Sequence, residues 1–430
     1  MLENDFRTLR QAYAEARDEA DPFERFNRAQ GVGAVVDPYP GLAAMRAQSA
    51  VHRLNLAGLM SDMKMSQINM MAASEIYTVL SYDAVFEVLR DGARFPSAGY
   101  KKSMGLVMGD TILAMDGAEH LRHRALISRA FTRRAIDRWE SELVRPIVNA
   151  YVDRFAAHGE TDLVRELTFP FPVHVVAAMI GLPESDHPAF HRLAVELISI
   201  GIDFDGAIRA ARELRELFAP VVAARRQHPQ DDLISVLAGA ELEGNRLSDE
   251  EIYSFLCLLA PAGAETTYRS SSNLLCGLLG NPDQFDAVRN DRSLIPQAIE
   301  EGLRWEPPLL SIMRTAAYDT ELAGVAIPEG APVAVNLGAA NRDPSRWNDP
   351  DRFDVFRAQK PHIAFAVGPH VCLGMHLARM ETRVLLDVLF ERLPNLRLDP
   401  EAEDTGITGL IFRSPKALRV RFDPAPERDT

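Results

Sequence analysis

The chain has 430 residues, 47% of them hydrophobic, which is enough to bury a large core. Its 61 acidic and 47 basic residues give a net charge of −14, which would repel the phosphates of nucleic acids and anionic membrane surfaces. Three cysteines do not make a disulfide framework and fit a reducing compartment. Residues 1–28 carry charges throughout, without an apolar run for a signal peptide or membrane anchor. We therefore expect a cytoplasmic protein that binds neither nucleic acid nor a membrane.

The length alone allows two or three domains. The chain has no linker, low-complexity tract or repeat, however, so we expect a single domain over residues 1–430. The β-rich parts are expected at about 45–80 and 310–340 and helices over the remainder. The predicted fold class is therefore mainly α with a small β-rich region.

The N-terminal third begins with a polar helix, predicted at residues 2–19. Alternating apolar residues then predict strands at 51–56 and 76–80, followed by a helix from Tyr82 to Leu89. Residues 95–116 contain three glycines and aperiodic apolar residues, which predict a long mobile loop. The adjacent charges Lys101 and Lys102 are either its solvated tip or a means of steering an anionic substrate.

A helix is predicted to begin at Asp116, with His120 and Arg124 four residues apart on one face. Between His120 and Ile136 the chain has arginines at 122, 124, 129, 133 and 134 and no acid. On so acidic a protein this is a candidate docking patch for an acidic partner, the alternative being an ordinary charged helix face. Farther on, residues 193–205 have the apolar, glycine-punctuated composition of a lid.

A long central helix is predicted from the N-cap Ser248 to about Leu279. It is nearly all apolar, so it should cross the core. Within it, Pro261 removes one backbone hydrogen bond and Gly263 lowers helix propensity, which predicts a locally opened helix.

The segment Ala262-Gly263-Ala264-Glu265-Thr266-Thr267 places small and polar residues inside this apolar helix. Ala262 and Gly263 would leave room for a ligand against the backbone, with the hydroxyl of Thr266 one turn on. A buried Glu265 would need a partner or would titrate, as a proton carrier does. The alternatives are a polar helix face for Glu265 and Thr266, and a close helix crossing for Gly263.

The next helix, at 296–304, has Glu301 and Arg304 three residues apart, which alone would be an ordinary surface pair. An apolar strand follows and ends at Arg314. Residues 320–327 and 333–337 predict a hairpin that turns at 328–330. Proline and aspartate then predict a loop at 341–353, and a closing strand pair is expected at 409–412 and 418–422.

The most informative stretch is 365–374, a Gly/Pro-rich loop that delivers Cys372 to the first turn of a helix. Unpaired N–H groups and the helix dipole favour a thiolate there, so the sulfur is expected to be a metal ligand or a nucleophile. A structural zinc site would need four ligands, and the chain has no second His/Cys cluster besides His370 and His376. A nucleophile with a histidine partner stays open. Cys257 and Cys276 lie in apolar helical runs and are expected to be buried.

This loop resembles the haem loop of the cytochrome P450 family, whose pattern is Phe-Gly-x-Gly-x-His/Arg-x-Cys-x-Gly. Ala366 replaces the first glycine, and the matching residues are Phe365, Gly368, His370, Cys372 and Gly374. The family's H/W-x-x-x-R, A/G-G-x-D/E-T-T and Glu-x-x-Arg motifs are matched at 120/124, 262–267 and 301/304. Four motifs occur in the family's order, and the resemblance covers essentially the whole chain.

The resemblance implies the mainly helical cytochrome P450 fold, haem b (iron protoporphyrin IX) as cofactor and Cys372 as the iron ligand. It also implies proton delivery by Glu265 and Thr266 and a structural ion pair between Glu301 and Arg304. Further cofactor contacts are implied for His120, Arg124, Ala262, Gly263, Arg314, Phe365, His370 and Gly374.

The implied activity is that of a bacterial-type monooxygenase, a monomer that inserts one oxygen atom of O2 into a small molecule. Electrons would come from NAD(P)H through ferredoxin reductase and ferredoxin. The positions expected to line the pocket are apolar and favour a neutral hydrophobic substrate: Leu258, Ala262, Leu310, Ile312, Leu410, Ile411 and Phe412. The alternatives are a peroxide-using or rearranging haem-thiolate enzyme, whose members usually lack the Glu-Thr pair, and a non-catalytic haem sensor or carrier.

Overall fold

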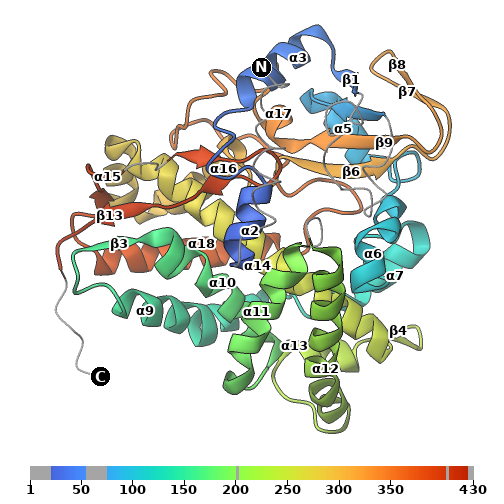
Figure 1. The fold of residues 1–430 in the computed structure, drawn as a ribbon, viewed down its shortest axis with the longest axis horizontal. Helices are drawn as coiled ribbons and strands as arrows, with labels where there is room; N and C mark the ends of the chain where they lie inside the picture. The colour runs from blue at the N-terminus through green and yellow to red at the C-terminus, as the bar shows by residue number, and fades with distance from the viewer. Residues whose placement is uncertain (1–20, 55–74, 200–202, 403–405, 425–430) are drawn as a thin grey trace.

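A computed structural model describes residues 21–54, 75–199, 203–402 and 406–424. The predicted helix at 2–19 and the end of the predicted strand at 51–56 lie outside the described residues. Helices pack around a long central helix, and a small β-rich region lies at one side, which confirms the predicted fold class (Figure 1). The helices are α2 (Pro22–Ala29), α3 (Tyr39–Gln48), α5 (Tyr82–Arg90), α6 (Met104–Met108), α7 (Gly117–Ser128), α8 (Arg133–Trp139), α9 (Arg145–Asp153), α10 (Pro170–Ile180), α11 (His187–Ile198), α12 (Phe204–Gln227), α13 (Leu233–Gly239), α14 (Asp249–Leu279), α15 (Pro282–Asn290), α16 (Ile295–Trp305), α17 (Leu337–Asn341) and α18 (Met375–Arg392).

The main sheet joins the two β-rich parts of the sequence. Its order is β1-β2-β9-β6, with β2 and β9 parallel and the other neighbours antiparallel. The first two strands come from the N-terminal part and the others from the C-terminal part: β1 (Val51–Leu54), β2 (Ile76–Val79), β6 (Ser311–Thr315) and β9 (Pro332–Asn336). Strands more than 250 residues apart in sequence therefore share one sheet.

The predicted hairpin is wrong in its register. Its first stretch folds on itself, with β7 (Thr320–Leu322) paired to β8 (Val325–Ile327). The turn lies at Ala323 and Gly324, whose φ values of 49° and 81° give the left-handed conformation that tight hairpins require. The strand that follows residues 328–330 is β9, which pairs with β2 and β6 instead.

The predicted closing strand pair is also wrong. Residues 409–412 form the turn between β11 (Ile407–Thr408) and β12 (Ser414–Pro415). Gly409, at φ +108°, lies so close to the Phe412 carbonyl that a Cβ on it would be 2.3 Å from that oxygen. The last strand, β13 (Arg419–Arg421), pairs with β10 (Arg397–Leu398) and β3 (Glu160–Asp162). A further short hairpin joins β4 (Glu241–Leu242) and β5 (Asn245–Arg246).

The stretch at 95–116 is more ordered in structure than the predicted loop. It contains a 3-10 helix at Ala98–Lys102 and then α6. The Asp116 carboxylate accepts hydrogen bonds from the backbone of Ser97 and Ala98, at 3.0 and 2.9 Å, and so fastens the start of the stretch to α7. Its lysines are exposed, and Lys101 lies 3.9 Å from Glu119 in an ion pair.

The central helix α14 has the predicted bounds. Ser248 and Glu251 form a reciprocal capping box at its start. The helix continues through Pro261 without a break, so the predicted local opening is wrong. Residues on either side of Pro261, such as Ala260 and Ala264, are buried in the main core, and this packing outweighs one lost hydrogen bond.

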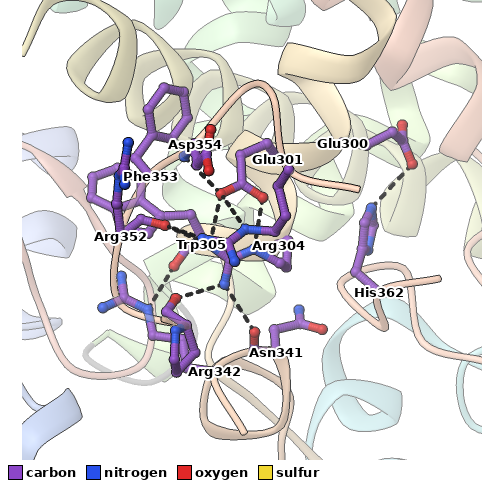
Figure 2. A network of polar contacts seen from close by, with 12 residues as sticks. Glu300, Glu301, Arg304, Trp305, Asn341, Arg342, Arg352, Phe353, Asp354 and His362 are labelled. Atoms are coloured by element: carbon purple, nitrogen blue, oxygen red, sulfur yellow. Dashed lines mark hydrogen bonds and ion pairs between the residues drawn. The ribbon is translucent and has the colours of Figure 1, made fainter. Parts of the chain in front are cut away.

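Glu301 and Arg304 form an ion pair inside the protein rather than on its surface. Figure 2 shows the Arg304 guanidinium donating to both Glu301 oxygens, at 2.7 and 2.8 Å. It also donates to backbone carbonyls on the far side, those of Asn341, Pro350 and Arg352. These contacts fasten α16 to residues 341–354, which precede the Cys372 loop.

We expect Arg304→Met to lower the free energy of unfolding by about 3–5 kcal/mol, because it leaves the buried Glu301 carboxylate with less compensation. Urea unfolding curves would measure the loss. The control is Arg133→Met, since Arg133 is 93% exposed and pairs with Asp137 only at 3.7 Å. That variant should unfold like the parent. Equal curves for both variants would contradict a structural role for the Arg304 pair.

Candidate active site

The Cys372 loop is closed by backbone contacts. The Cys372 N–H donates to the Phe365 carbonyl at 2.9 Å, and Phe365 itself stacks under the Arg379 guanidinium. Gly368, at φ +77°, is required, since a Cβ would lie 2.4 Å from the Leu89 carbonyl oxygen. Ala366 also has a left-handed φ, of 57°, where the family pattern has glycine, which costs about 1 kcal/mol. Gly374 is the N-cap of α18, so the loop leads directly into that helix.

The Cys372 side chain is accessible, yet protein surrounds it on most sides. This desolvation raises the pKa of its thiol, although the Gly374 N–H and the guanidinium groups of Arg124 and Arg379 oppose the rise. The Gly374 N–H and the two cations thus favour the thiolate as predicted, and burial of the loop works against them. No histidine among the described residues hydrogen-bonds to this sulfur, so the arrangement favours a metal ligand over an activated nucleophile.

Three nitrogen-bearing side chains near this loop have no carboxylate within ion-pair distance in the described part of the chain. His120 is 1% exposed, and its Nε2 has no hydrogen-bond partner there. Arg314, 5% exposed on β6, donates to the Met313 carbonyl at 2.7 Å. Arg124 donates to the Val371 carbonyl, next to Cys372, at 2.6 Å. Burial lowers the pKa of both arginines.

His370 lies between these groups and the start of α7. Its ring is 4.1 Å from that of His120, and its Nε2 is 3.3 Å from Asp116 Oδ1. Burial, followed by the charges of His370 and Arg124, lowers the pKa of His120 to about 4, so His120 is neutral at pH 7. Burial would raise the pKa of Asp116, but its hydrogen bonds from His370 and the backbone outweigh burial and lower it.

Sequence reasoning missed Asp116 and Tyr100 as parts of this site. Asp116 joins the 95–116 stretch to His370. Its position four residues before His120, on the same side of the helix start, could have identified it from the sequence. The Tyr100 hydroxyl accepts the Met313 N–H at 2.9 Å, next to Arg314. No sequence signal identifies Tyr100, because its partner strand lies more than 200 residues away.

On α14, Ala262 is exposed and Thr266 is partly exposed, one turn apart on the same side of the helix. The Thr266 hydroxyl donates to the Ala262 carbonyl at 2.8 Å. Gly263 points elsewhere. A Cβ on it would lie 2.9 Å from Val176 of α10. The close crossing of these two helices therefore accounts for the glycine, and the predicted room for a ligand is not needed to explain it.

Glu265 is 4% exposed and is partnered. Its carboxylate binds the fully buried guanidinium of Arg269, one turn on, with Arg269 Nε at 2.5 Å. Burial raises the pKa of Glu265, and the Arg269 charge limits that rise.

The predicted substrate residues are not all brought together. Leu310 is buried in a separate cluster with Tyr39 and Leu80, and Leu410 packs against Val35. Leu258 belongs to the main core. Ile312 and Ile411 are partly exposed. Phe412, also partly exposed, lies against Phe26 of α2, with ring centroids 5.7 Å apart.

The arginine-rich stretch divides between the surface and the interior. Arg124 turns inward toward Val371. The exposed arginine patch therefore consists of Arg122, Arg129, Arg133 and Arg134, on and between α7 and α8.

Comparison with known proteins shows to which family the chain belongs. The family model described as Cytochrome P450 matches residues 201–416. Cytochrome P450 107B1 of Saccharopolyspora erythraea is 34% identical over 380 residues, which are 85% of this chain and 93% of that protein. The chain belongs to the cytochrome P450 family.

Two further relatives extend the comparison. Cytochrome P450 monooxygenase PikC of Streptomyces venezuelae is 33% identical over 408 residues, covering 92% of this chain and 93% of that protein. The crystal structure of CYP109E1 from Bacillus megaterium in complex with testosterone superposes with a TM-score of 0.79 at 30% identity, covering 90% of this chain and 99% of that one. This chain is accordingly a cytochrome P450 monooxygenase, an oxidoreductase with a haem-thiolate cofactor.

The residues present fit that cofactor. Haem carries two carboxylates, and the nitrogen-bearing groups of buried His120 and Arg314 and of partly buried Arg124 are without acidic partners among the described residues. The accessible sulfur of Cys372 lies beside Arg124. No described helix combines the length and apolar character needed to cross a bilayer.

We expect Gly263→Ala to lower the thermal unfolding midpoint, because its methyl group would overlap Val176. Val176→Ala leaves a small cavity and should also destabilise the protein. If Gly263 serves the helix crossing, the double variant should be less destabilised than the sum of the single variants. Strict additivity of the two losses would contradict that explanation.

Proposed function

We propose that the protein is a cytoplasmic, single-domain, monomeric monooxygenase that carries haem b and hydroxylates a neutral hydrophobic small molecule. Its electrons would come from NAD(P)H through a ferredoxin reductase and a ferredoxin. The observation that carries the proposal is the accessible Cys372 sulfur together with buried His120 and Arg314 and partly buried Arg124, which have no acidic partner among the described residues.

In this proposal each residue has a separate task. Cys372 would ligate the iron, and the Arg124 and Arg314 guanidinium groups would bind the cofactor carboxylates. Neutral His120 has its Nε2 available to hydrogen-bond a carboxylate oxygen. When bound, the haem supplies the redox chemistry by which dioxygen is activated. Phe365, His370, Gly374 and Ala262 would lie against it.

Thr266 and Glu265 manage protons in the proposed reaction. The Thr266 hydroxyl, which hydrogen-bonds to the Ala262 carbonyl, can rotate to donate its proton into the accessible space beside Ala262. Glu265 would hold or release a proton at Oε2, because both contacts of Arg269 are made to the other oxygen, Oε1. Gly263 is given no cofactor role in this proposal, because a Cβ on it would meet Val176 of α10.

The substrate is proposed to be hydrophobic because the predicted pocket residues that keep some exposure are apolar. Ile312, Ile411 and Phe412 keep partial exposure, whereas Leu310 and Leu410 are packed in their own clusters and are weaker candidates. The testosterone complex of a relative supports a molecule of this general character. The test is substrate-dependent NADH consumption with a surrogate ferredoxin system and detection of an oxygenated product. A bound compound that shifts the Soret band but never yields product would instead indicate a carrier.

We expect Thr266→Ala to leave substrate binding and haem reduction near normal, because neither step uses the hydroxyl. Electrons should be diverted from product to hydrogen peroxide, since a proton donor is lost. The ratio of product formed to NADH consumed, with peroxide measured in parallel, reports this. Thr408→Ala is the control, since Thr408 is a buried threonine on β11. Parent-like coupling in Thr266→Ala would remove this residue from oxygen activation.

The arginine patch is proposed to dock an acidic ferredoxin. Charge reversal at Arg133 and Arg134 should slow reduction at low ionic strength and weaken its salt dependence, with haem content unchanged. Glutamates in the first turn of α8 also suit its dipole, so the helix should persist. The control is Arg419→Glu on β13, at the opposite side of Figure 1 from α7. Stopped-flow reduction rates that match the parent would exclude the patch from docking.

A further inference from the structure

The short helix α2 lies against α14, from which it is distant in sequence (Figure 1). One face of it is aromatic. Phe23 lies 3.7 Å from the Phe169 ring and 5.7 Å from Tyr268 of α14, by ring centroids. Phe26 packs on Phe412, which is a proposed substrate contact. The helix therefore borders both α14 and the C-terminal turn.

The polar contact under α2 is made with Arg269 of α14, which is fully buried. Its guanidinium donates to Asn27 Oδ1 at 2.6 Å and to the Ser414 hydroxyl at 2.8 Å, as well as to Glu265. The rings of Phe26, Tyr268 and Phe412 surround it at 5.7, 4.9 and 5.4 Å.

Two features make Asn27 more than a packing contact. Within the described residues Glu265 is the only carboxylate paired with Arg269, and the NH2 nitrogen that pairs with it also donates to Asn27. A buried charged donor that loses an acceptor costs about 1–3 kcal/mol or more, so Arg269 would reorient if Asn27 were removed. Any reorientation moves the positive charge relative to the Glu265 carboxylate.

We propose that Asn27 is a positioning residue for proton delivery, which holds the Arg269 guanidinium on Glu265 from α2. The inference rests on the proposed role of Glu265. It implies that the protonation state of Glu265 on α14 depends on the packing of α2 against α14.

One other titratable group belongs to this network: the Tyr268 hydroxyl hydrogen-bonds at 2.9 Å to Ser414, which also accepts from Arg269. The remaining titratable groups nearby have other partners. Arg413, on the C-terminal segment, binds Glu306. From α18, Glu381 is buried beside Thr267 rather than Glu265, and burial raises its pKa to about 8. From α11, His191 stacks on Phe169. Arg269 is thus the charge through which Asn27 can act.

The test compares Asn27→Asp and Asn27→Leu with Glu24→Gln. Glu24 lies on the same helix but pairs with Arg165 at the surface. Asn27→Asp is nearly isosteric and adds a second negative charge at Arg269, so Glu265 should keep its proton to a higher pH, by about one unit or more. Infrared spectra of the ferric holoenzyme against pH, with the carboxyl band assigned by Glu265→Gln, measure this without turnover.

In turnover, both Asn27 variants should lose product per NADH and gain peroxide, while substrate affinity and haem content stay at the parent level. Glu24→Gln should behave like the parent in every measurement. If Asn27→Leu does not fold, Asn27→Asp alone decides the outcome. An unshifted Glu265 band in Asn27→Asp would overturn the inference. A shifted band with parent-like coupling would support the positioning by Asn27 but overturn proton delivery by Glu265, which separates the two proposals.

Discussion

The structure depends on placing arginine charge inside a helical core, which is possible only where fixed acceptors surround each guanidinium. Arg304 is held by Glu301 and by carbonyls of residues 341–352. Arg413 is held by Glu306, which also accepts the Tyr39 hydroxyl at 2.6 Å. In each case at least one acceptor comes from a segment distant in sequence. The buried arginines therefore join the C-terminal segments to the helices and fix where the Cys372 loop begins.

The same constraint distinguishes the site from the rest of the core. Arg304, Arg413 and Arg269 each have a carboxylate partner, whereas Arg314 and Arg124 have only backbone carbonyls among the described residues. A buried cation without an anion costs free energy unless a ligand supplies the anion. Such unpaired cations lower the stability of the protein without ligand, and a bound carboxylate would offset this loss.

Several features were predictable because their causes are local. The capping box at Ser248 fixes the start of α14, and the spacing of Glu301 and Arg304 gives their pairing. The hairpin was misjudged because an alanine, Ala323, occupies a left-handed turn position that sequence reasoning assigns to glycine or asparagine. The contact between Asn27 and Arg269 joins residues 242 apart, and neither residue has a local pattern that identifies the other. Non-local contacts of this kind depend on the complete fold.

Helical geometry also divides a motif that is continuous in sequence. Successive residues of a helix point about 100° apart, so neighbours in the 262–267 segment face different surroundings. Ala262 and Thr266, four apart, share the accessible side. Gly263 meets α10, while Glu265 and Arg269, again four apart, meet α2 and the C-terminal segment. The proposed proton delivery and helix packing would thus impose separate demands on adjacent residues. The glycine satisfies the packing demand, and the glutamate is available for chemistry only through the partner that α2 holds in place.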